Sequence, residues 1–307
     1  MTVRRTGVRS GVALACLMGA AVAGQQVFRG RTDLVVLNVT VHDGAGRLVP
    51  GLARDDFQVF EDGVLQEVAN FTRDAQPIAL SLLLDSSVSM EPRLKTVQEA
   101  AIGFARRLSA RDLAQVIEFD THAQVLQPFT ADVALLEQAI RRTEAGGSTA
   151  LYNALYIAFN EFKRERARSL EDIRRQAVVI LSDGEDTSSV VSFDLVMDEA
   201  KRSEVMTYAI GLRPKDLSPN RGWNEAEFVL RSIARETGGR AYLIEDARQL
   251  AGIYDQIAQE LANQYTIGYV SKNQKRDGAW RRIAVQLTRA DSVARTRTGY
   301  FAPTAPR

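Results

Sequence analysis

The residues best suited to chemistry follow an apolar segment near position 80. This segment ends in Asp85, and the hydroxyl residues Ser87 and Ser89 come two and four positions later. Because side chains alternate along an extended chain, these three are expected to face the same way. Carboxylate and hydroxyl oxygens are hard ligands that suit Mg²⁺ or Mn²⁺ rather than zinc or copper. The spacing therefore indicates a site for a divalent cation.

Two later segments complete the proposed ligand set. Thr149 follows Gly146 and Gly147 just before an expected helix, and Asp183 ends a second apolar strand. The glycines would let the backbone come close to the site without a Cβ clash. Ligands of open α/β sheets bind at the carboxyl ends of the strands, so these segments are expected to meet there. The predicted metal ligands are Asp85, Ser87, Ser89, Thr149 and Asp183.

Mg²⁺ prefers six oxygen ligands and keeps some of them as water. We expect Ser87 and Ser89 to coordinate directly and Asp85 to act mainly through water. Thr149 and Asp183 are expected to exchange between direct and water-mediated contact. Few charged direct ligands leave the ion electropositive, with an outward position for an anionic oxygen. An aspartate or glutamate side chain of a partner protein fits that position.

Helix capping is the alternative explanation for the first segment. Asp85 or Ser89 could cap the helix expected around Leu94, since both residue types are favoured at helix N-termini. Capping explains one such segment well. It explains three separate segments poorly, because each lies at a strand end or a helix start.

The middle of the chain alternates strands with helices, which predicts an α/β fold with a doubly wound, mainly parallel sheet. Apolar stripes at spacings of three and four predict helices over 94–108, 151–162 and 250–261. Apolar runs predict strands over 78–84, 115–119, 177–181, 206–210 and 241–244.

Both flanks of this region have the period-two pattern of β-strands. A hairpin is predicted over 57–65 and a last strand over 293–300. Neither flank has enough strands for independent stability, so we expect the two to pair. The predicted organisation is a small β domain made from residues 25–75 and 264–307, with the α/β domain, residues 76–263, inserted into it.

The first 24 residues resemble a secretory signal peptide, with a basic start, a short apolar stretch and a small-residue cleavage site at Ala21-Val22-Ala23. A short anchor helix is the alternative. We expect a secreted protein, periplasmic or extracellular, with no membrane insertion after cleavage. Cys16 is the only cysteine, so we expect neither disulfides nor thiolate metal sites in the mature chain. A net charge of +1 gives no reason to expect nucleic acid as a partner.

The motif Asp85-x-Ser87-x-Ser89, followed by Thr149 and then Asp183, resembles the metal-ion-dependent adhesion site of von Willebrand factor type A (VWFA) domains. The resemblance covers about residues 78–263, and the order of strands and helices agrees. Residues 56–63, 264–269 and 299–303 also resemble segments that flank the domain in bacterial secreted VWFA-related proteins. The resemblance implies a Rossmann-like fold and Mg²⁺-dependent binding of a protein partner.

Three functions remain open at this point, of which a secreted adhesion-type module without enzymatic activity is favoured. The second is a structural or assembly module of the cell envelope with a fold-stabilising metal. The third is a metal-assisted hydrolase using Ser87, with His122 as base. No Gly-x-Ser-x-Gly elbow supports it. In related domains the final helix can shift on ligand binding. We therefore also expect ligand binding to change the conformation of the β domain.

Overall fold

A six-stranded sheet in the order β10-β9-β8-β5-β6-β7 lies at the centre of the α/β segment. The computed structural model describes residues 1–2, 34–165, 174–213 and 224–304, so the signal peptide predicted over 1–24 lies almost entirely outside the described residues. All pairs of neighbouring strands are parallel except β6 and β7. The strands are β5 (Ile78–Asp85), β6 (Leu113–Phe119), β7 (Ala123–Thr130), β8 (Arg175–Ser182), β9 (Met206–Leu212) and β10 (Ala241–Ile244).

The predicted doubly wound sheet is confirmed, and each strand predicted from an apolar run is present. Strands β5 and β8 are almost entirely buried, as expected of central strands covered on both faces. The edge strand β7 was not predicted. It is only partly buried and carries Gln124, Gln127 and Pro128, so it lacks the continuous apolar pattern of its neighbours.

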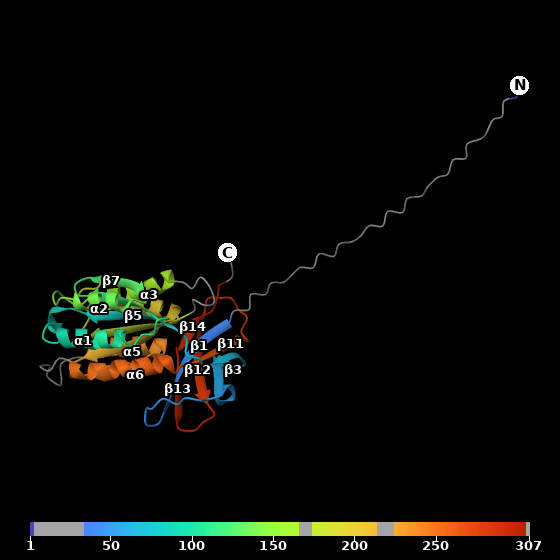
Figure 1. Ribbon diagram of the computed structural model, residues 1–307. Coiled ribbons are helices and arrows are strands. Elements are labelled where there is room, and N and C mark those ends of the chain that lie inside the picture. Colours follow the sequence, from blue (N-terminus) through green and yellow to red (C-terminus); the bar gives the residue numbers. More distant parts are fainter. Residues whose placement is uncertain (3–33, 166–173, 214–223, 305–307) are drawn as a thin grey trace. The chain divides into compact units, whose positions relative to one another are not determined.

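Helices cover both faces of this sheet (Figure 1). One face packs against α1 (Leu94–Ala105), α2 (Val133–Arg141) and α6 (Leu250–Ala262). The other packs against α3 (Leu151–Arg164), α4 (Phe193–Arg202) and α5 (Asn224–Thr237). None of the helices in the described part of the chain is long and apolar enough to cross a membrane.

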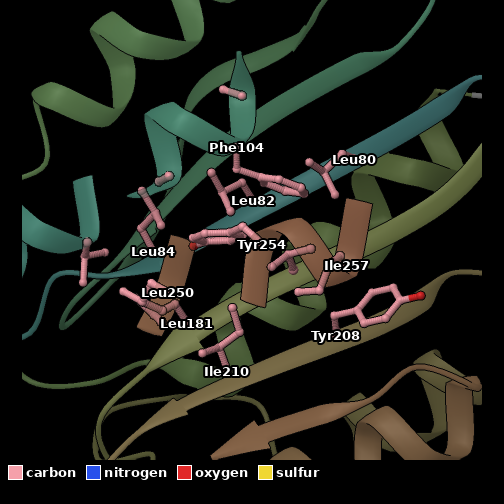
Figure 2. Close-up of a cluster of buried hydrophobic side chains, with 14 of the residues drawn as sticks. Leu80, Leu82, Leu84, Phe104, Leu181, Tyr208, Ile210, Leu250, Tyr254 and Ile257 are labelled. Carbon is pink, nitrogen blue, oxygen red and sulfur yellow. The ribbon is translucent and has the colours of Figure 1, made fainter. Parts of the chain in front are cut away.

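The alternation of side chains along β5 serves both cores. Leu80, Leu82 and Leu84 join the core beneath α1 and α6, which Figure 2 shows, whereas Leu83 joins the opposite core. In the first core the rings of Phe104 and Tyr254 stack with centroids 4.8 Å apart, which joins α1 to α6. Helix α6 is therefore packed firmly against the sheet along its apolar side.

The two chain ends form a pair of four-stranded sheets that pack face to face. The orders are β13-β1-β11-β4 and β14-β12-β2-β3, so each sheet combines strands from both ends and the predicted pairing is confirmed. Pairing is antiparallel throughout. The strands are β1 (Leu34–Asp43), β2 (Phe57–Glu61), β3 (Val64–Gln66), β4 (Val68–Thr72), β11 (Tyr265–Val270), β12 (Trp280–Leu287), β13 (Ser292–Arg295) and β14 (Gly299–Phe301).

The single last strand predicted over 293–300 is wrong, because this segment contributes two strands to different sheets. Strand β13 pairs with β1, and β14 pairs with β12. The residues between them, Thr296, Arg297 and Thr298, cross from one sheet to the other. The residues between the two strands include neither glycine nor proline, so the sequence gives no turn signal at the break.

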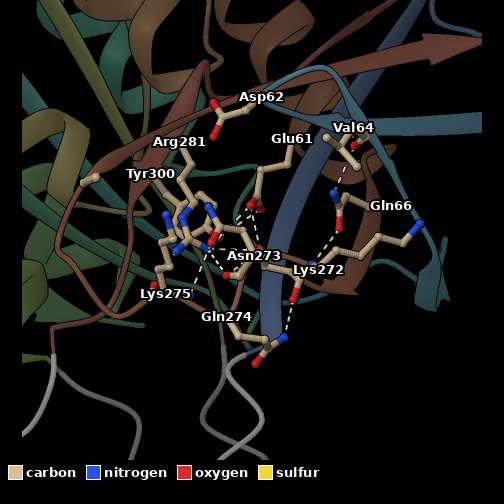
Figure 3. Close-up of polar contacts among 12 residues, drawn as sticks. Glu61, Asp62, Val64, Gln66, Lys272, Asn273, Gln274, Lys275, Arg281 and Tyr300 are labelled. Atoms are coloured by element: carbon tan, nitrogen blue, oxygen red, sulfur yellow. Dashed lines mark hydrogen bonds and ion pairs between the residues drawn. The ribbon is translucent and has the colours of Figure 1, made fainter.

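A buried polar cluster joins the two chain ends inside the β region (Figure 3). The carboxylate of Glu61, from the N-terminal part, accepts hydrogen bonds from the hydroxyls of Tyr269 at 2.8 Å and Tyr300 at 3.0 Å. Arg281 lies 3.5 Å from the same carboxylate. Glu61 and Arg281 are 2% and 3% exposed, so each charge is stabilised by partners rather than by water.

Candidate metal centre

The strands β5 and β8 bring two aspartates together at the carboxyl edge of the sheet. Their parallel register pairs Leu84 with Leu181, so Asp85, the last residue of β5, lies near Asp183, which follows the end of β8. Ser182, at the end of β8, donates a hydrogen bond of 2.5 Å to Oδ2 of Asp85. The predicted meeting of these two segments is thus present in the structure.

The hydroxyls of the first segment connect the two aspartates. The Oγ atoms of Ser87 and Ser89 lie 3.0 Å apart, and Ser89 donates to Oδ1 of Asp183 at 2.7 Å. The backbone N–H of Ser87 donates to Oδ1 of Asp85 at 2.9 Å. These short links hold four of the five predicted ligands in one small space.

Thr149 lies beside this group at the start of α3. A Cβ atom placed on Gly184 would lie 3.7 Å from Oγ1 of Thr149, so this hydroxyl faces the residue that follows Asp183. The backbone N–H of Thr149 donates to Oγ1 of Thr187 at 3.0 Å, which fixes the residue in place. Among the hydrogen bonds of the described residues, none joins the Thr149 side chain to the other four.

The glycine loop before Thr149 is tied to the serine loop through backbone atoms. Gly146 donates to the carbonyl oxygen of Ser86 at 2.8 Å, and Val88 donates to that of Gly147 at 3.3 Å. Gly147 has a positive φ of 67°, and a Cβ there would lie 2.4 Å from Oγ1 of Thr121. Glycine is therefore required by close approach to the loop after β6, rather than by approach to the ligands themselves.

Burial makes both carboxylates of the site costly to ionise. Asp85 is 0% exposed, and desolvation raises its pKa to about 6, although Ser182 and Ser87 oppose the shift. Desolvation also raises the pKa of Asp183, against the stabilising effects of Ser89 and Arg93. Nη1 of Arg93 lies 3.0 Å from Oδ2 of Asp183. Added positive charge would therefore stabilise this site.

The capping explanation does not account for these residues. Helix α1 begins after Arg93, and no side chain caps its N-terminus. The Ser89 hydroxyl bonds to Asp183 instead, and Asp85 accepts from Ser87 and Ser182. Their side chains hold the loops of the site together and leave the helix uncapped.

The donor set fits a hard divalent cation. Two carboxylates and three hydroxyls offer oxygen ligands alone, as Mg²⁺ and Mn²⁺ prefer. Within the described ranges, no group of three or more His, Cys, Asp or Glu side chains could hold a metal ion. A metal ion at this centre would therefore use the hydroxyls of Ser87, Ser89 and Thr149 as well as the two carboxylates.

Other polar residues near the site have structural roles. Asp186 accepts hydrogen bonds from the backbone of Tyr152 and Ser189 at 2.9 and 3.1 Å, so it joins its loop to α3. Asp120 accepts from the backbone N–H of His122 at 2.9 Å and forms a turn. In the described part of the chain, no hydrogen bond or ion pair links His122 to Ser87.

Comparison with known families shows the family of the α/β segment. The family model of the von Willebrand factor type A domain matches residues 80–256, which is more than half of the chain and includes all five predicted ligands. The chain belongs to the von Willebrand factor type A (VWA) family. Domains of this family commonly serve as protein-interaction modules.

One curated relative is the inter-alpha-trypsin inhibitor heavy chain H1 of Sus scrofa, 27% identical over 201 residues. The match covers 61% of this chain but only 21% of that protein, so the chain spans about a fifth of its relative. The VWA protein of Catenulispora acidiphila has a similar structure, with a TM-score of 0.52 and 15% identity over 90% of this chain and 76% of that one. A mutant PilB minor pilin of Streptococcus sanguinis has a TM-score of 0.50 and 12% identity, and the match covers 62% of this chain and 63% of that one. At these identities the structural likeness shows the fold alone.

Two residues of the candidate metal centre were not predicted from the sequence. Ser182 immediately precedes Asp183, and its place at the end of a strand beside Asp85 was the available signal. Arg93 carries no such signal, because nothing in its spacing from Asp85 places it against Asp183. The turn through η2 (Val88–Met90) redirects the chain, so that the guanidinium of Arg93 reaches the carboxylate of Asp183.

Proposed function

We propose that this VWA protein is a secreted, divalent-metal-dependent protein-binding module. In this proposal Mg²⁺ or Mn²⁺ is held by the five oxygen-bearing residues of the candidate metal centre. The ion captures an aspartate or glutamate of a partner protein. The resemblance of residues 1–24 to a signal peptide supports the secreted part.

The observation that carries the proposal is the continuous link from Ser87 through Ser89 to Asp183. Its contacts of 3.0 and 2.7 Å gather hydroxyl and carboxylate oxygens at one edge of the sheet. Ser89 is exposed, whereas the aspartates beneath it are buried. An ion held between the buried carboxylates and the exposed Ser89 hydroxyl could still bind a ligand that approaches from solvent.

The charges of the site favour an acidic ligand. Two carboxylates, the guanidinium of Arg93 and one divalent cation leave a single net positive charge. A carboxylate from a partner would neutralise that charge in a setting where the side chain of Asp183 is fully buried. The residues of this chain would hold and orient the ion, and the ion would supply the attraction for the partner.

Manganese binding tests the proposal directly. We expect the wild-type protein to bind one Mn²⁺, measured by electron paramagnetic resonance, and Asp85→Ala to lose this binding. Glu91→Gln is a matched control, because it removes an exposed carboxylate two positions after Ser89. A pull-down from cell-envelope extract should then recover a partner only without chelator. Wild-type protein that binds no Mn²⁺ would disprove the metal part of the proposal.

A structural role for the ion is the second candidate, and the burial of both aspartates favours it. A cation that relieves the desolvation of Asp85 and Asp183 would stabilise the fold even without a partner. Asp85→Ala separates the two roles. Loss of partner binding at an unchanged melting temperature supports adhesion. A melting temperature that chelator lowers in the wild type but not in Asp85→Ala supports a structural ion.

Ligand binding at the candidate metal centre is also proposed to change the β region through helix α6. Helix α6 ends just before β11, and its Glu260 pairs with Arg295 of β13 and lies 3.2 Å from Nε2 of His42 in β1. A shift of α6 would therefore act on both strands. We expect Mg²⁺ and ligand to change hydrogen exchange in β1 and β13, and unchanged exchange would count against the coupling.

A further inference from the structure

A cleft with a volume of 720 Å³ lies between the end of α5 and strands β12 and β13. We call it the arginine cleft, because five arginines line it. Each of them has a carboxylate partner beside the cleft, and Arg231 pairs with Glu227 at 2.6 Å. Apolar side chains such as Ile283 and Val285 form part of its wall. The lining arginines are Arg231, Arg235, Arg240, Arg295 and Arg297.

The walls of the arginine cleft are held in place by the fold. Nε of Arg295 donates to the carbonyl oxygen of Gly238 at 3.0 Å, and the Thr298 hydroxyl donates to Glu236 at 2.6 Å. Gly238 has a φ of 82°, and a Cβ there would lie 2.5 Å from the backbone nitrogen of Arg297. The α5–β10 turn therefore packs directly on the segment between β13 and β14, which preforms the cleft.

The arginines differ in how firmly they are engaged. Arg297 and Arg295 are 12% and 24% exposed, and both have close carboxylate partners in Glu204 and Glu260. The rim arginines Arg235 and Arg240 are 72% and 43% exposed, and their nearest carboxylate contacts are 3.8 Å long. Exposed pairs of this length contribute little, so the rim guanidiniums can exchange them for a ligand.

Two buried polar atoms on the lining lack a protein partner. Nε of Arg297 is a donor without an acceptor, and Oγ1 of Thr296 makes no hydrogen bond. Buried donors of this kind are rare in folded proteins, and each one calls for an explanation. Both residues also line a small second cavity beside Glu204, so the case for a ligand in the arginine cleft rests on the exposed rim arginines.

We propose that the arginine cleft is a binding site for a phosphate ester. Guanidinium groups match the oxygens of phosphate and bind them through paired, charge-assisted hydrogen bonds. The apolar wall at Ile283 and Val285 would receive the organic part of the ligand. The two sites share no residue, so binding in the cleft can be tested with the metal removed.

Inorganic pyrophosphate is the test probe, used with chelator-treated full-length protein so that no divalent ion takes part. Isothermal titration calorimetry should show one site with a dissociation constant below about 1 mM at physiological salt, as for a modest charge-driven interaction. Arg235→Gln and Arg240→Gln should each weaken binding about tenfold, because each removes a charge-assisted contact. Both residues are exposed, so the fold should persist, and melting curves will verify this.

Arg142→Gln is the matched control, because it removes an exposed arginine on the opposite face of the sheet from α5. It should leave the affinity unchanged. Binding that weakens equally in the control, or is unaffected by both rim variants, would show only general attraction and would overturn the proposal. Absence of any pyrophosphate binding would overturn it as well. Sulfate serves as a second probe, and tighter binding of sulfate would reject phosphate as the ligand class.

Discussion

Arg93 and Asp183 form an ion pair within the candidate metal centre, with Nη1 of Arg93 3.0 Å from Oδ2 of Asp183. The guanidinium therefore neutralises a carboxylate that a divalent cation would also use, and the two cations would repel one another. We expect Arg93→Gln to bind Mn²⁺ about tenfold more tightly, equivalent to about 1.4 kcal/mol. The measurement is a Mn²⁺ titration followed by electron paramagnetic resonance.

Two further variants make this result specific to Arg93. Arg93→Lys keeps the charge and should stay close to wild type, and Lys95→Gln removes an exposed charge nearby without a contact to Asp183. If Arg93→Gln binds Mn²⁺ no more tightly than Lys95→Gln, then Arg93 does not compete with the metal ion for Asp183. The metal centre itself would stand, provided that wild-type protein still binds the ion.

Gly147 and Gly146 are adjacent glycines with different requirements. Alanine at Gly147 would adopt a positive φ and place its Cβ 2.4 Å from Thr121, whereas alanine at Gly146 meets nothing within 4 Å. We expect Gly147→Ala to cost at least about 1–2 kcal/mol of stability from its backbone conformation alone. It should also weaken Mn²⁺ binding, because its loop carries Thr149. Thermal melts and Mn²⁺ titrations should leave Gly146→Ala near wild type, and equal effects in both variants would contradict this account.

Arg175 secures the joint between the VWA segment and the β region. Its guanidinium donates to the carbonyl oxygens of Leu261 at 3.0 Å and Gln264 at 2.9 Å, and to that of Asp74 at 3.3 Å. These acceptors lie where the chain leaves and enters the VWA segment. Burial lowers the pKa of Arg175 to about 10, so these carbonyl groups must offset the cost of a buried charge.

We expect Arg175→Lys to lower the free energy of unfolding by about 2–4 kcal/mol. A lysine cannot reach the same divergent acceptors, and the carbonyl groups left behind would be buried without donors. Urea unfolding measures the change. Arg282→Lys, at an exposed position on β12, is the control and should change stability by less than about 0.5 kcal/mol. If Arg175→Lys lowers the free energy of unfolding no more than Arg282→Lys does, the joint does not depend on the Arg175 guanidinium.

His42 should make stability sensitive to pH. Burial lowers its pKa below 6.5, with Arg295 and Arg240 acting in the same direction and Glu260 opposing them. The unfolded chain therefore takes up a proton first as the pH falls. The contribution of neutral His42 is fully present above about pH 6.5 and is lost as the pH falls through the lower pKa of the folded state.

The test compares wild type with His42→Gln by urea unfolding between about pH 7.5 and 5. We expect the wild type to lose more stability than the variant over this range, since only the wild type must protonate a buried imidazole. The acidic residues common to both proteins cancel in the difference. Parallel pH profiles would show that the shift at His42 has no energetic consequence.

The sequence by itself determined the α/β sheet, its central strands and the residues of the candidate site. Continuous apolar runs such as β5 and β8 are typical of parallel strands that are buried on both faces. The alternation of Asp85, Ser87 and Ser89 carries local information about which side chains share a direction. Separate motifs at the strand ends then converge, because the carboxyl ends of parallel strands meet at one edge.

Only the tertiary structure decided the long-range polar contacts. The pairing of Arg93 with Asp183, the placement of Arg175 at the interdomain joint and the gathering of arginines in the cleft all join residues far apart in the chain. Long, flexible arginine side chains leave no periodic signal, because their charged ends can point in many directions. The break between β13 and β14 also depended on which strands were available to pair, a property of the assembled sheets rather than of the local pattern.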